Sequence, residues 1–269
     1  MTLPPLLLVG CGKMGSAMLA GWLERGLARE SVVVEPNPAA AAPFAGRLRC
    51  VPTLADLPQG FAPEAIVLAV KPQEAAHVLP ALARFAAGGP LFLSIMAGRR
   101  VAGMRALLGD AARIVRAMPN TPAAVRQGFT VAFAGPGVAA AQKALADALL
   151  SAIGECAWVE EESLLDPVTA VSGGGPAYVF LLAELLEEAA VAEGVPAELA
   201  RRMARATVAG SGALLAASSE DAATLRRHVT SPKGTTEQAL AVLMAPEAWP
   251  ALMRRAIAAA TARARELAG

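Results

Sequence analysis

The sequence predicts an α/β fold in residues 1–160, followed by an all-helical domain in residues 161–269. Three observations carry this prediction. Short apolar runs alternate with helix-like segments in the first part, which is typical of a Rossmann-like, doubly wound parallel sheet. A glycine-rich turn directly follows the first of these runs. From residue 163 onward no strand pattern remains, and the acidic triplet at 160–162 is interpreted as a solvated linker.

The turn after the first strand has the spacing of a dinucleotide-binding loop. A buried strand expected at residues 6–10 runs into the segment GCGKMG at 10–15, after which apolar residues recur at helical spacing. In this G-x-G-x-x-G pattern, Gly10 would allow the tight turn and Gly12 the close approach of a pyrophosphate. Gly15 would let the helix pack on the strand. A plain strand, turn and helix without a ligand is the alternative.

The second strand, expected at residues 31–34, ends at a carboxylate. Glu35 lies roughly 20 residues beyond the glycines, where an acidic side chain can bond the ribose 2′-hydroxyl of NAD. This position favours NADH over NADPH, although Asn37 and nearby backbone amides could still bind a 2′-phosphate. Glu35 is also compatible with a solvated strand end.

Three further strands are expected to bring side chains to one edge of the sheet, because the carboxyl ends of parallel strands open on the ligand crevice. Lys71 is also compatible with a surface charge, and Asn120 with a turn before a proline. The three strands are residues 65–70, 91–95 and 113–117, followed by Lys71-Pro72, Met96-Ala97-Gly98 and Asn120.

Two last strands and a helix between them would complete the sheet, and helices fill the rest of the chain. The strands are expected at 129–133 and 156–159, with the helix at 138–153. The later helices are expected at 176–193, 197–217, 221–228, 235–244 and 247–267.

Two helix starts in the second half could face a ligand with free backbone N–H groups. The glycines at 173–175 precede Pro176 at an expected first helical position. Thr235 and Gln238 have capping-box spacing, and such a helix end suits a carboxylate. Close packing of small residues at the first start, and a merely capped helix at the second, are the alternatives.

Composition favours a small substrate and a homo-oligomer. The 269 residues carry a net charge of +1, which gives no basic face for nucleic acid or an anionic membrane. Hydrophobic residues make up 55% of the chain, so subunit interfaces are expected. No membrane span is expected, because glycine and proline interrupt the most apolar stretch, and no signal peptide is expected. Three cysteines without metal or redox spacing suit a reducing cytoplasm.

The residues present argue against a metal site and against hydrolysis, and they favour hydride transfer. His77 and His228 have no partner at metal-ligand spacing, so no metal is expected. The sequence contains no Gly-x-Ser-x-Gly motif, so hydrolysis by a nucleophilic serine is not indicated. A dinucleotide loop with few acid–base residues favours hydride transfer, in which the cofactor carries the chemistry. A protonated imine suits such a site better than a ketone, whose reduction needs a strong proton donor.

The motifs GCGKMG, AVKPQ, SIMAG, RAMPNTPA, AVSGGGPAYVF and HVTSPKGTT, in this order, resemble those of the pyrroline-5-carboxylate reductase family. The resemblance covers nearly the whole chain. It implies reduction of the cyclic imine 1-pyrroline-5-carboxylate to L-proline by NADPH or NADH, the last step of proline biosynthesis. It also implies a helical dimerisation domain that forms a homodimer, commonly with dimers assembled into larger rings.

The patterns and the resemblance together give the expected site residues. Thr236 is the catalytic candidate, because the resemblance places it near the ring nitrogen, where it would orient the imine or relay a proton. Substrate-binding residues would be Gly175, Ser231, Lys233, Gly234, Thr235 and Thr236. Cofactor-binding residues would be Gly10, Gly12, Lys13, Met14, Gly15, Glu35, Asn37, Ala69, Val70, Lys71, Pro72, Ala97, Gly98 and Asn120.

The chain departs from the family pattern at a few positions near the expected substrate loop. Lys233 replaces the first glycine of SPGGTT, and Gly174 replaces a serine. Asp221-Ala222 stands where His-Pro is usual, and Arg227 replaces an acidic residue. Glu220 matches a family acid only loosely. These departures bear on the substrate contacts and leave the hydride-transfer residues in place.

Two other functions remain open. A β-hydroxyacid dehydrogenase would combine similar domains, but it needs a catalytic lysine in the first helix of the helical domain. No lysine occurs between residues 176 and 193. A non-catalytic nucleotide-binding scaffold would keep the fold without turnover, and the intact Thr235-Thr236 pair argues against it.

Overall fold

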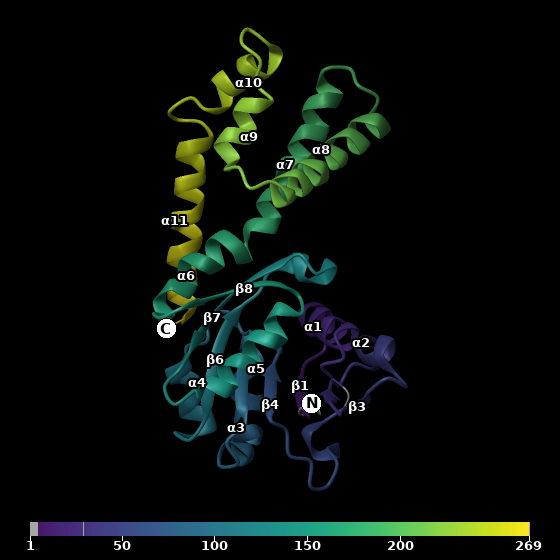
Figure 1. Ribbon diagram of the computed structural model, residues 1–269, viewed down its shortest axis with the longest axis vertical. Coiled ribbons are helices and arrows are strands. Elements are labelled where there is room, and N and C mark those ends of the chain that lie inside the picture. The colour runs from purple at the N-terminus through teal and green to yellow at the C-terminus, as the bar shows by residue number, and fades with distance from the viewer. Residues whose placement is uncertain (1–4, 29, 269) are drawn as a thin grey trace. The chain divides into compact units, whose positions relative to one another are not determined.

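The computed structural model describes residues 5–28 and 30–268 (Figure 1). The outer ends of the two expected domains, residues 1–4 and 269, lie outside the described residues. By its contacts the chain divides into two compact units, Met1–Gly173 with Ala260–Gly269, and Gly174–Ala259. The expected boundary at residue 160 falls inside the first of these units and stays a prediction.

The first unit contains an eight-stranded sheet in the order β3-β2-β1-β4-β5-β6-β7-β8. All neighbouring strands are parallel except β6 and β7. The strands are β1 (Leu6–Val9), β2 (Val32–Val34), β3 (Arg49–Val51), β4 (Ala65–Leu68), β5 (Leu91–Ser94), β6 (Arg113–Met118), β7 (Gly128–Ala134) and β8 (Gly154–Val159). The expected Rossmann-like fold followed by helices is confirmed.

The reversal between β6 and β7 follows from the length of their connection. Only residues 119–127 join the two strands, and they include the short 3₁₀ helix η4 (Thr121–Val125). A parallel crossover needs roughly a dozen residues or more, so β7 pairs antiparallel to β6. The helix α5 (Ala140–Ser151) then supplies a crossover, and β8 runs parallel to β7.

Helices cover both faces of the sheet, which is why its central strands are apolar on both sides (Figure 1). In β1 every residue is buried, and alternate side chains point to opposite faces. Leu6 and Leu8 join a core with α1 (Lys13–Glu24) and α5. Leu7 and Val9 join a second core with α3 (Ala75–Ala86) and α4 (Val101–Leu108).

The glycine segment before α7 differs from its expected form. We expect a turn-rich helix start at Pro176, whereas the chain is helical well before it. A short helix α6 (Leu165–Val168) and a π-helical turn (Thr169–Gly173) precede α7 (Gly175–Ala192). Pro176 lies in the first turn of α7, where its missing N–H costs no hydrogen bond. The start of α7 lies within one residue of its expected position, and whether its N–H groups face a ligand stays a prediction.

The same continuity corrects one expectation, that no stretch of the chain is long and apolar enough to span a membrane, whereas the absence of a membrane partner stays a prediction. One helical run among the described residues, Glu162–Ala192, is long and apolar enough to cross a membrane by length and composition. Glycine and proline do not interrupt it, because the π-helical turn carries the helix through. Only 6% of the most apolar 18-residue stretch of this helical run is buried within this chain.

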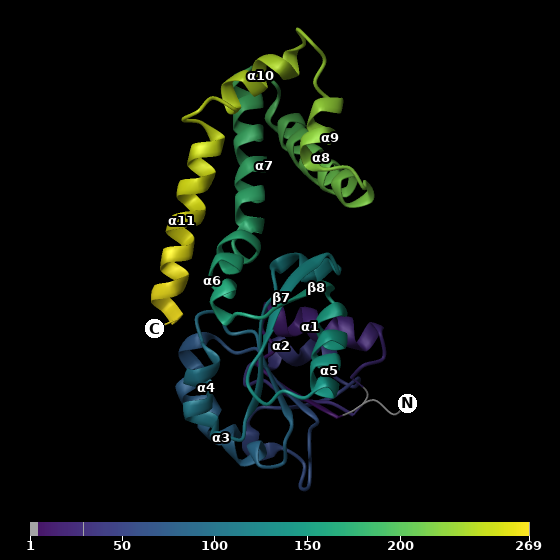
Figure 2. The same ribbon diagram turned by 60° about the vertical axis from the view of Figure 1, so that its left-hand side comes forward.

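The later helices lie close to their expected bounds. They are α8 (Ala197–Ala217), α9 (Ala222–His228), α10 (Thr235–Leu243) and α11 (Trp249–Ala268). Figure 2 shows α7 and α8 as long neighbouring helices, and they pack against each other. Large apolar side chains stay exposed in this half, among them Phe180, Leu185 and Leu252. Tyr178, Leu181 and Trp249 help to line an apolar groove of about 370 Å³.

Candidate active site

A cleft of about 640 Å³ opens at the carboxyl ends of β1, β2, β3 and β4. This is the edge at which a doubly wound sheet binds nucleotides. Seven of the expected cofactor residues line the cleft, namely Gly10, Gly12, Glu35, Asn37, Ala69, Val70 and Lys71. The structure therefore brings together expected residues from three separate segments of the chain.

Each of the three glycines in the loop is explained by a different structural requirement. Gly10 has a φ of +93°, and an added Cβ would lie 2.7 Å from the carbonyl oxygen of Ala69. A Cβ at Gly15 would clash with the carbonyl oxygen of Gly10. At Gly12 nothing lies within 4 Å of an added Cβ, so its open side is free for a ligand. These properties fit the expected close approach of a pyrophosphate at Gly12.

Glu35 braces the glycine loop. One carboxylate oxygen accepts the Cys11 N–H at 2.7 Å, and the other accepts the Asn37 N–H at 2.9 Å. A carboxylate offers about four acceptor positions, so Glu35 could still accept a ribose hydroxyl. The sequence predicts the contact of Glu35 with the ribose. It does not predict the two backbone hydrogen bonds, because they depend on the conformation of the folded loop.

Cys11 sits inside this loop as a neutral thiol. Burial raises the pKa of Cys11, and a hydrogen bond with Ser16 opposes this while the Glu35 charge adds to it. Ser16 also donates its hydroxyl to the Cys11 carbonyl at 2.7 Å. The side chains thus tie the first turn of α1 to the loop, and the thiol carries no charge near the expected phosphates.

The other expected cofactor residues do not line this cleft. They are Lys13, Met14, Gly15, Pro72, Ala97, Gly98 and Asn120. Gly98 has a φ of +67°, and an added Cβ would lie 2.9 Å from the Leu267 carbonyl oxygen. Packing against the end of α11 is thus a sufficient reason for this glycine. Asn120 has its own side-chain partners, described below.

Several lining residues escape the sequence analysis. Pro52, Thr53 and Leu54 follow β3, a strand of three residues that is too short to stand out as an apolar run. Glu74 and His77 line the cleft from the segment after Lys71. His77 is considered from sequence only as a metal ligand. No group of three or more potential metal ligands occurs in the part of the chain that the structure describes.

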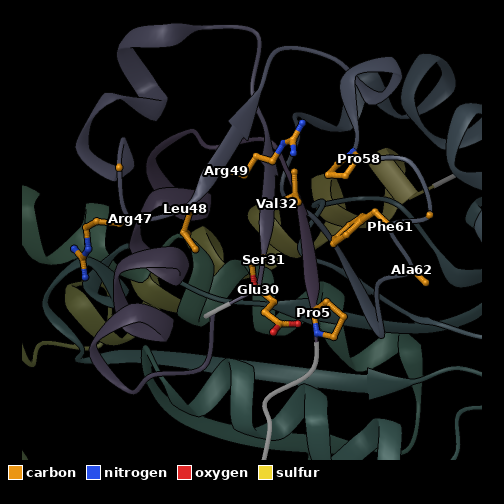
Figure 3. Close-up of a pocket in the computed structure, with 12 residues that line it drawn as sticks. Pro5, Glu30, Ser31, Val32, Arg47, Leu48, Arg49, Pro58, Phe61 and Ala62 are labelled. Atoms are coloured by element: carbon orange, nitrogen blue, oxygen red, sulfur yellow. The ribbon is translucent and has the colours of Figure 1, made fainter.

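A second hollow of about 670 Å³ lies at the opposite, amino ends of β1, β2 and β3 (Figure 3). The buried Ser31 hydroxyl lines it and has no hydrogen-bond partner among the described residues. Figure 3 shows the charged ends of Glu30, Arg47 and Arg49 pointing apart. Because no charged groups converge, this hollow has no features of a binding site.

The start of α10 contains the expected substrate loop. The N-cap is Gly234, with no side-chain cap of its own. The capping box predicted from Thr235 and Gln238 does not form. Instead Glu237 accepts the Lys233 N–H at 2.8 Å, because the helix begins with Thr235 as its first residue and Glu237 as its third.

This cap decides which amides of the loop remain for a ligand. The N–H groups of Lys233 and Gly234 are already bonded, the second to the Ser231 carbonyl at 3.0 Å. The N–H groups of Thr235 and Thr236 have no partner among the described residues, as in the first turn of any helix. The loop therefore offers two amides and two hydroxyls at a helix N-terminus.

Lys233 adopts the left-handed conformation, with a φ of +60°. Glycine takes this conformation without strain, which explains why the family pattern has a glycine here. Two other expected residues lie apart from this loop in the chain. Gly175 is the first residue of α7, and Glu220 lies 3.3 Å from Nδ1 of His228.

The fold and the cleft define the class of protein: a dinucleotide-dependent oxidoreductase with a helical second half. The family model "NADP oxidoreductase coenzyme F420-dependent" matches residues 6–98. The model "Pyrroline-5-carboxylate reductase dimerisation" matches residues 162–267. The chain belongs to the pyrroline-5-carboxylate reductase family.

Relatives along the full length agree with this assignment. The pyrroline-5-carboxylate reductase of Pseudomonas aeruginosa is 37% identical, over 100% of this chain and 98% of its own. The solved structure of the Coxiella burnetii pyrroline-5-carboxylate reductase is 33% identical, covers 100% of both chains and has a TM-score of 0.91. That of Plasmodium falciparum, with NADP bound, is 26% identical, covers 100% of both chains and has a TM-score of 0.84.

Proposed function

We propose that this protein reduces 1-pyrroline-5-carboxylate to L-proline with NADPH or NADH, in the last step of proline biosynthesis. The observation that carries the proposal is the cleft around Gly12, whose open side is free for a pyrophosphate, in a chain of the pyrroline-5-carboxylate reductase family. The bound cofactor would supply the hydride for the imine carbon. The protein's part is to bind, orient and protonate.

The glycine loop would hold the cofactor through backbone amides. The first turn of α1 has no side-chain cap, so its N–H groups remain for a phosphate. Lys13, Met14 and Gly15 would contribute at this turn. Ala69, Val70 and Lys71, with Pro72, would border the ribose. The remaining proposed cofactor residues at the carboxyl edge are Ala97, Gly98 and Asn120, near the nicotinamide.

The start of α10 would hold the substrate carboxylate. The free N–H groups of Thr235 and Thr236 and the helix dipole suit an anion, and the Lys233 ammonium adds positive charge. Ser231 and Gly234 shape the loop, and Gly175 would add a small surface. The Thr236 hydroxyl would orient the imine nitrogen, which gains a proton as the imine carbon gains the hydride.

The test of this function is the initial rate of NADPH and NADH oxidation with 1-pyrroline-5-carboxylate. We expect turnover in the native protein. In Thr236→Ala and in the isosteric Thr236→Val, kcat/KM should fall about tenfold, the effect of losing one hydrogen bond in the transition state. Thr236→Ser keeps the hydroxyl and should retain most activity. Equal rates in all four proteins would remove Thr236 from the mechanism.

The cofactor preference should depend on the charge of Glu35. This carboxylate lines the cleft and would repel a 2′-phosphate, so we propose that NADH is the better substrate. Glu35→Gln should raise the ratio of kcat/KM for NADPH to that for NADH by about tenfold, equivalent to ~1.4 kcal/mol. The ratio cancels any common damage to the loop that Glu35 braces. An unchanged ratio would show that Glu35 does not select the cofactor.

The oligomer is proposed to be a homodimer formed through the helical half, with dimers assembling into a ring. Exposed apolar side chains such as Phe180 and Leu252 need a cover, and a second copy supplies one without a membrane. Three free cysteines fit a reducing cytoplasm. Light scattering in detergent-free buffer would test the dimer, and a monomer would contradict it.

The alternative functions predict other outcomes in the same assay. A β-hydroxyacid dehydrogenase would reduce NAD or NADP with a β-hydroxyacid, and α7 contains no lysine for that chemistry. A nucleotide-binding scaffold would bind NADPH and turn over nothing. Cofactor binding without imine reduction would therefore contradict the reductase and favour the scaffold.

A further inference from the structure

The side chain of Asn120 is fixed by two hydrogen bonds within the first unit. Its Oδ1 accepts the Phe129 N–H at 2.9 Å, and its Nδ2 donates to the Ser172 hydroxyl at 3.2 Å. Because an N–H can only donate, the Phe129 contact fixes which end of the amide is oxygen. The second hydrogen on Nδ2 has no partner among the described residues, so it remains for a ligand oxygen.

The strand pairing explains why Asn120 meets Phe129. Met118 lies opposite Val131 in the antiparallel pair of β6 and β7. Because the strands are antiparallel, Asn120, two residues after Met118, comes opposite Phe129, two residues before Val131. The side-chain oxygen of Asn120 thus takes the place of a backbone acceptor where the two strands separate.

Ser172 comes from the π-helical turn, and the turn is held against the same face of β6. Arg116, Met118 and Asn120 are alternate residues, so their side chains project to one side. Arg116 lies 3.2 Å from Glu162, and Asn120 bonds Ser172. Arg116 and Met118 on β6, with Asn120 just beyond its end, form a row that docks residues 162–173.

Met118 and Arg116 make this docking close. An added Cβ at Gly173 would lie 2.5 Å from the terminal methyl of Met118, so the turn touches the strand here. Arg116 is 3% exposed and Asp166 is 2% exposed, with 3.9 Å between their nearest charged atoms. Arg100 reaches the other oxygen of Asp166 at 3.1 Å. The segment carrying Ser172 is therefore fixed at both of its ends.

We propose that Ser172 is a positioning residue for hydride transfer, acting through Asn120. This rests on the proposed function, in which Asn120 lies beside the nicotinamide at the carboxyl edge of the sheet. Ser172 holds the Asn120 amide in one orientation, with its free donor hydrogen available to the cofactor. π-Helical turns are rare and occur often at functional sites, which agrees with this role.

The test compares Ser172→Ala with Ser172→Thr, which keeps the hydroxyl. We expect Ser172→Ala to lower kcat about fivefold, the effect of one hydrogen bond, and to raise the deuterium isotope effect with 4-deuterated NADPH. The Kd for NADPH, measured by its fluorescence, should change less than about twofold, because the glycine loop still holds the pyrophosphate. Ser172→Thr should restore most of kcat.

A double-mutant cycle decides whether Ser172 acts through Asn120. In an Asn120→Ala background, Ser172→Ala should have no further effect on kcat, whereas fully additive effects would contradict the proposal. Ser163→Ala is the matched control, an exposed serine on the same segment, and it should behave as the native protein. If the native protein fails to reduce the imine, the proposed function is wrong. If the native protein reduces the imine and Ser172→Ala has the same kcat as the native protein, the proposed function stands and this inference alone is wrong.

Discussion

Replacing Arg116 by methionine is expected to lower the free energy of unfolding by about 3 kcal/mol, because it breaks a buried ion cluster. Arg116 lies within 4 Å of both Glu162 and Asp166, and Asp166 is almost fully buried. Without the guanidinium, Asp166 keeps Arg100 as a cationic partner, and Glu162 keeps no cationic partner among the described residues. Thermal unfolding should show a melting temperature lower by roughly 5–10 °C.

Arg113→Met is the matched control for this prediction. Arg113 lies on the same strand, is exposed and forms no ion pair within the described residues. Its replacement should change the free energy of unfolding by less than about 0.5 kcal/mol. If both variants unfold at the native temperature, the buried cluster does not stabilise the segment that carries Ser172.

Gly12→Ala is expected to weaken cofactor binding about 100-fold and to leave the fold intact, because the new methyl group meets only the space of the ligand. Gly12 has a φ of −66° and a ψ of −168°, which alanine can also adopt. Titration of NADPH fluorescence would give the Kd, and circular dichroism would check the fold. A native Kd would show that the pyrophosphate does not approach Gly12.

Gly15→Ala provides the contrast, since it adds the same methyl group three residues later. This methyl would clash with the Gly10 carbonyl oxygen inside the protein. We expect it to destabilise the fold by about 1–3 kcal/mol, as overpacking does. Opposite outcomes for the two variants would separate the ligand-facing glycine from the packing glycine.

The apolar patterns were sufficient to place most of the sheet and the helices. Central strands buried on both faces leave unbroken runs such as residues 65–68, and these are legible in the sequence. The strand β3 (Arg49–Val51) is short and partly exposed, so it leaves no such run. The antiparallel turn between β6 and β7 depends on the length of a connection, which apolar patterns do not report.

The site was harder to predict from the sequence, because its contacts join residues that are far apart in the chain. The glycine spacing predicts the loop, but the bracing of Cys11 by Glu35 spans 24 residues and exists only in the fold. The pair of Asn120 and Ser172 spans 52 residues. At α10 the choice of cap depended on a shift of one residue in the helix start, which motif spacing does not resolve.

The most direct test of the central claim is the fate of the hydride. The native protein would be incubated with 1-pyrroline-5-carboxylate and either NADH or NADPH deuterated at C4 of the nicotinamide, on each face in turn, and the product analysed by mass spectrometry and NMR. The account predicts L-proline with one deuterium on the ring carbon that was the imine carbon, from one face only. Deuterium-free proline from both labelled faces, or no proline from either cofactor, would contradict it.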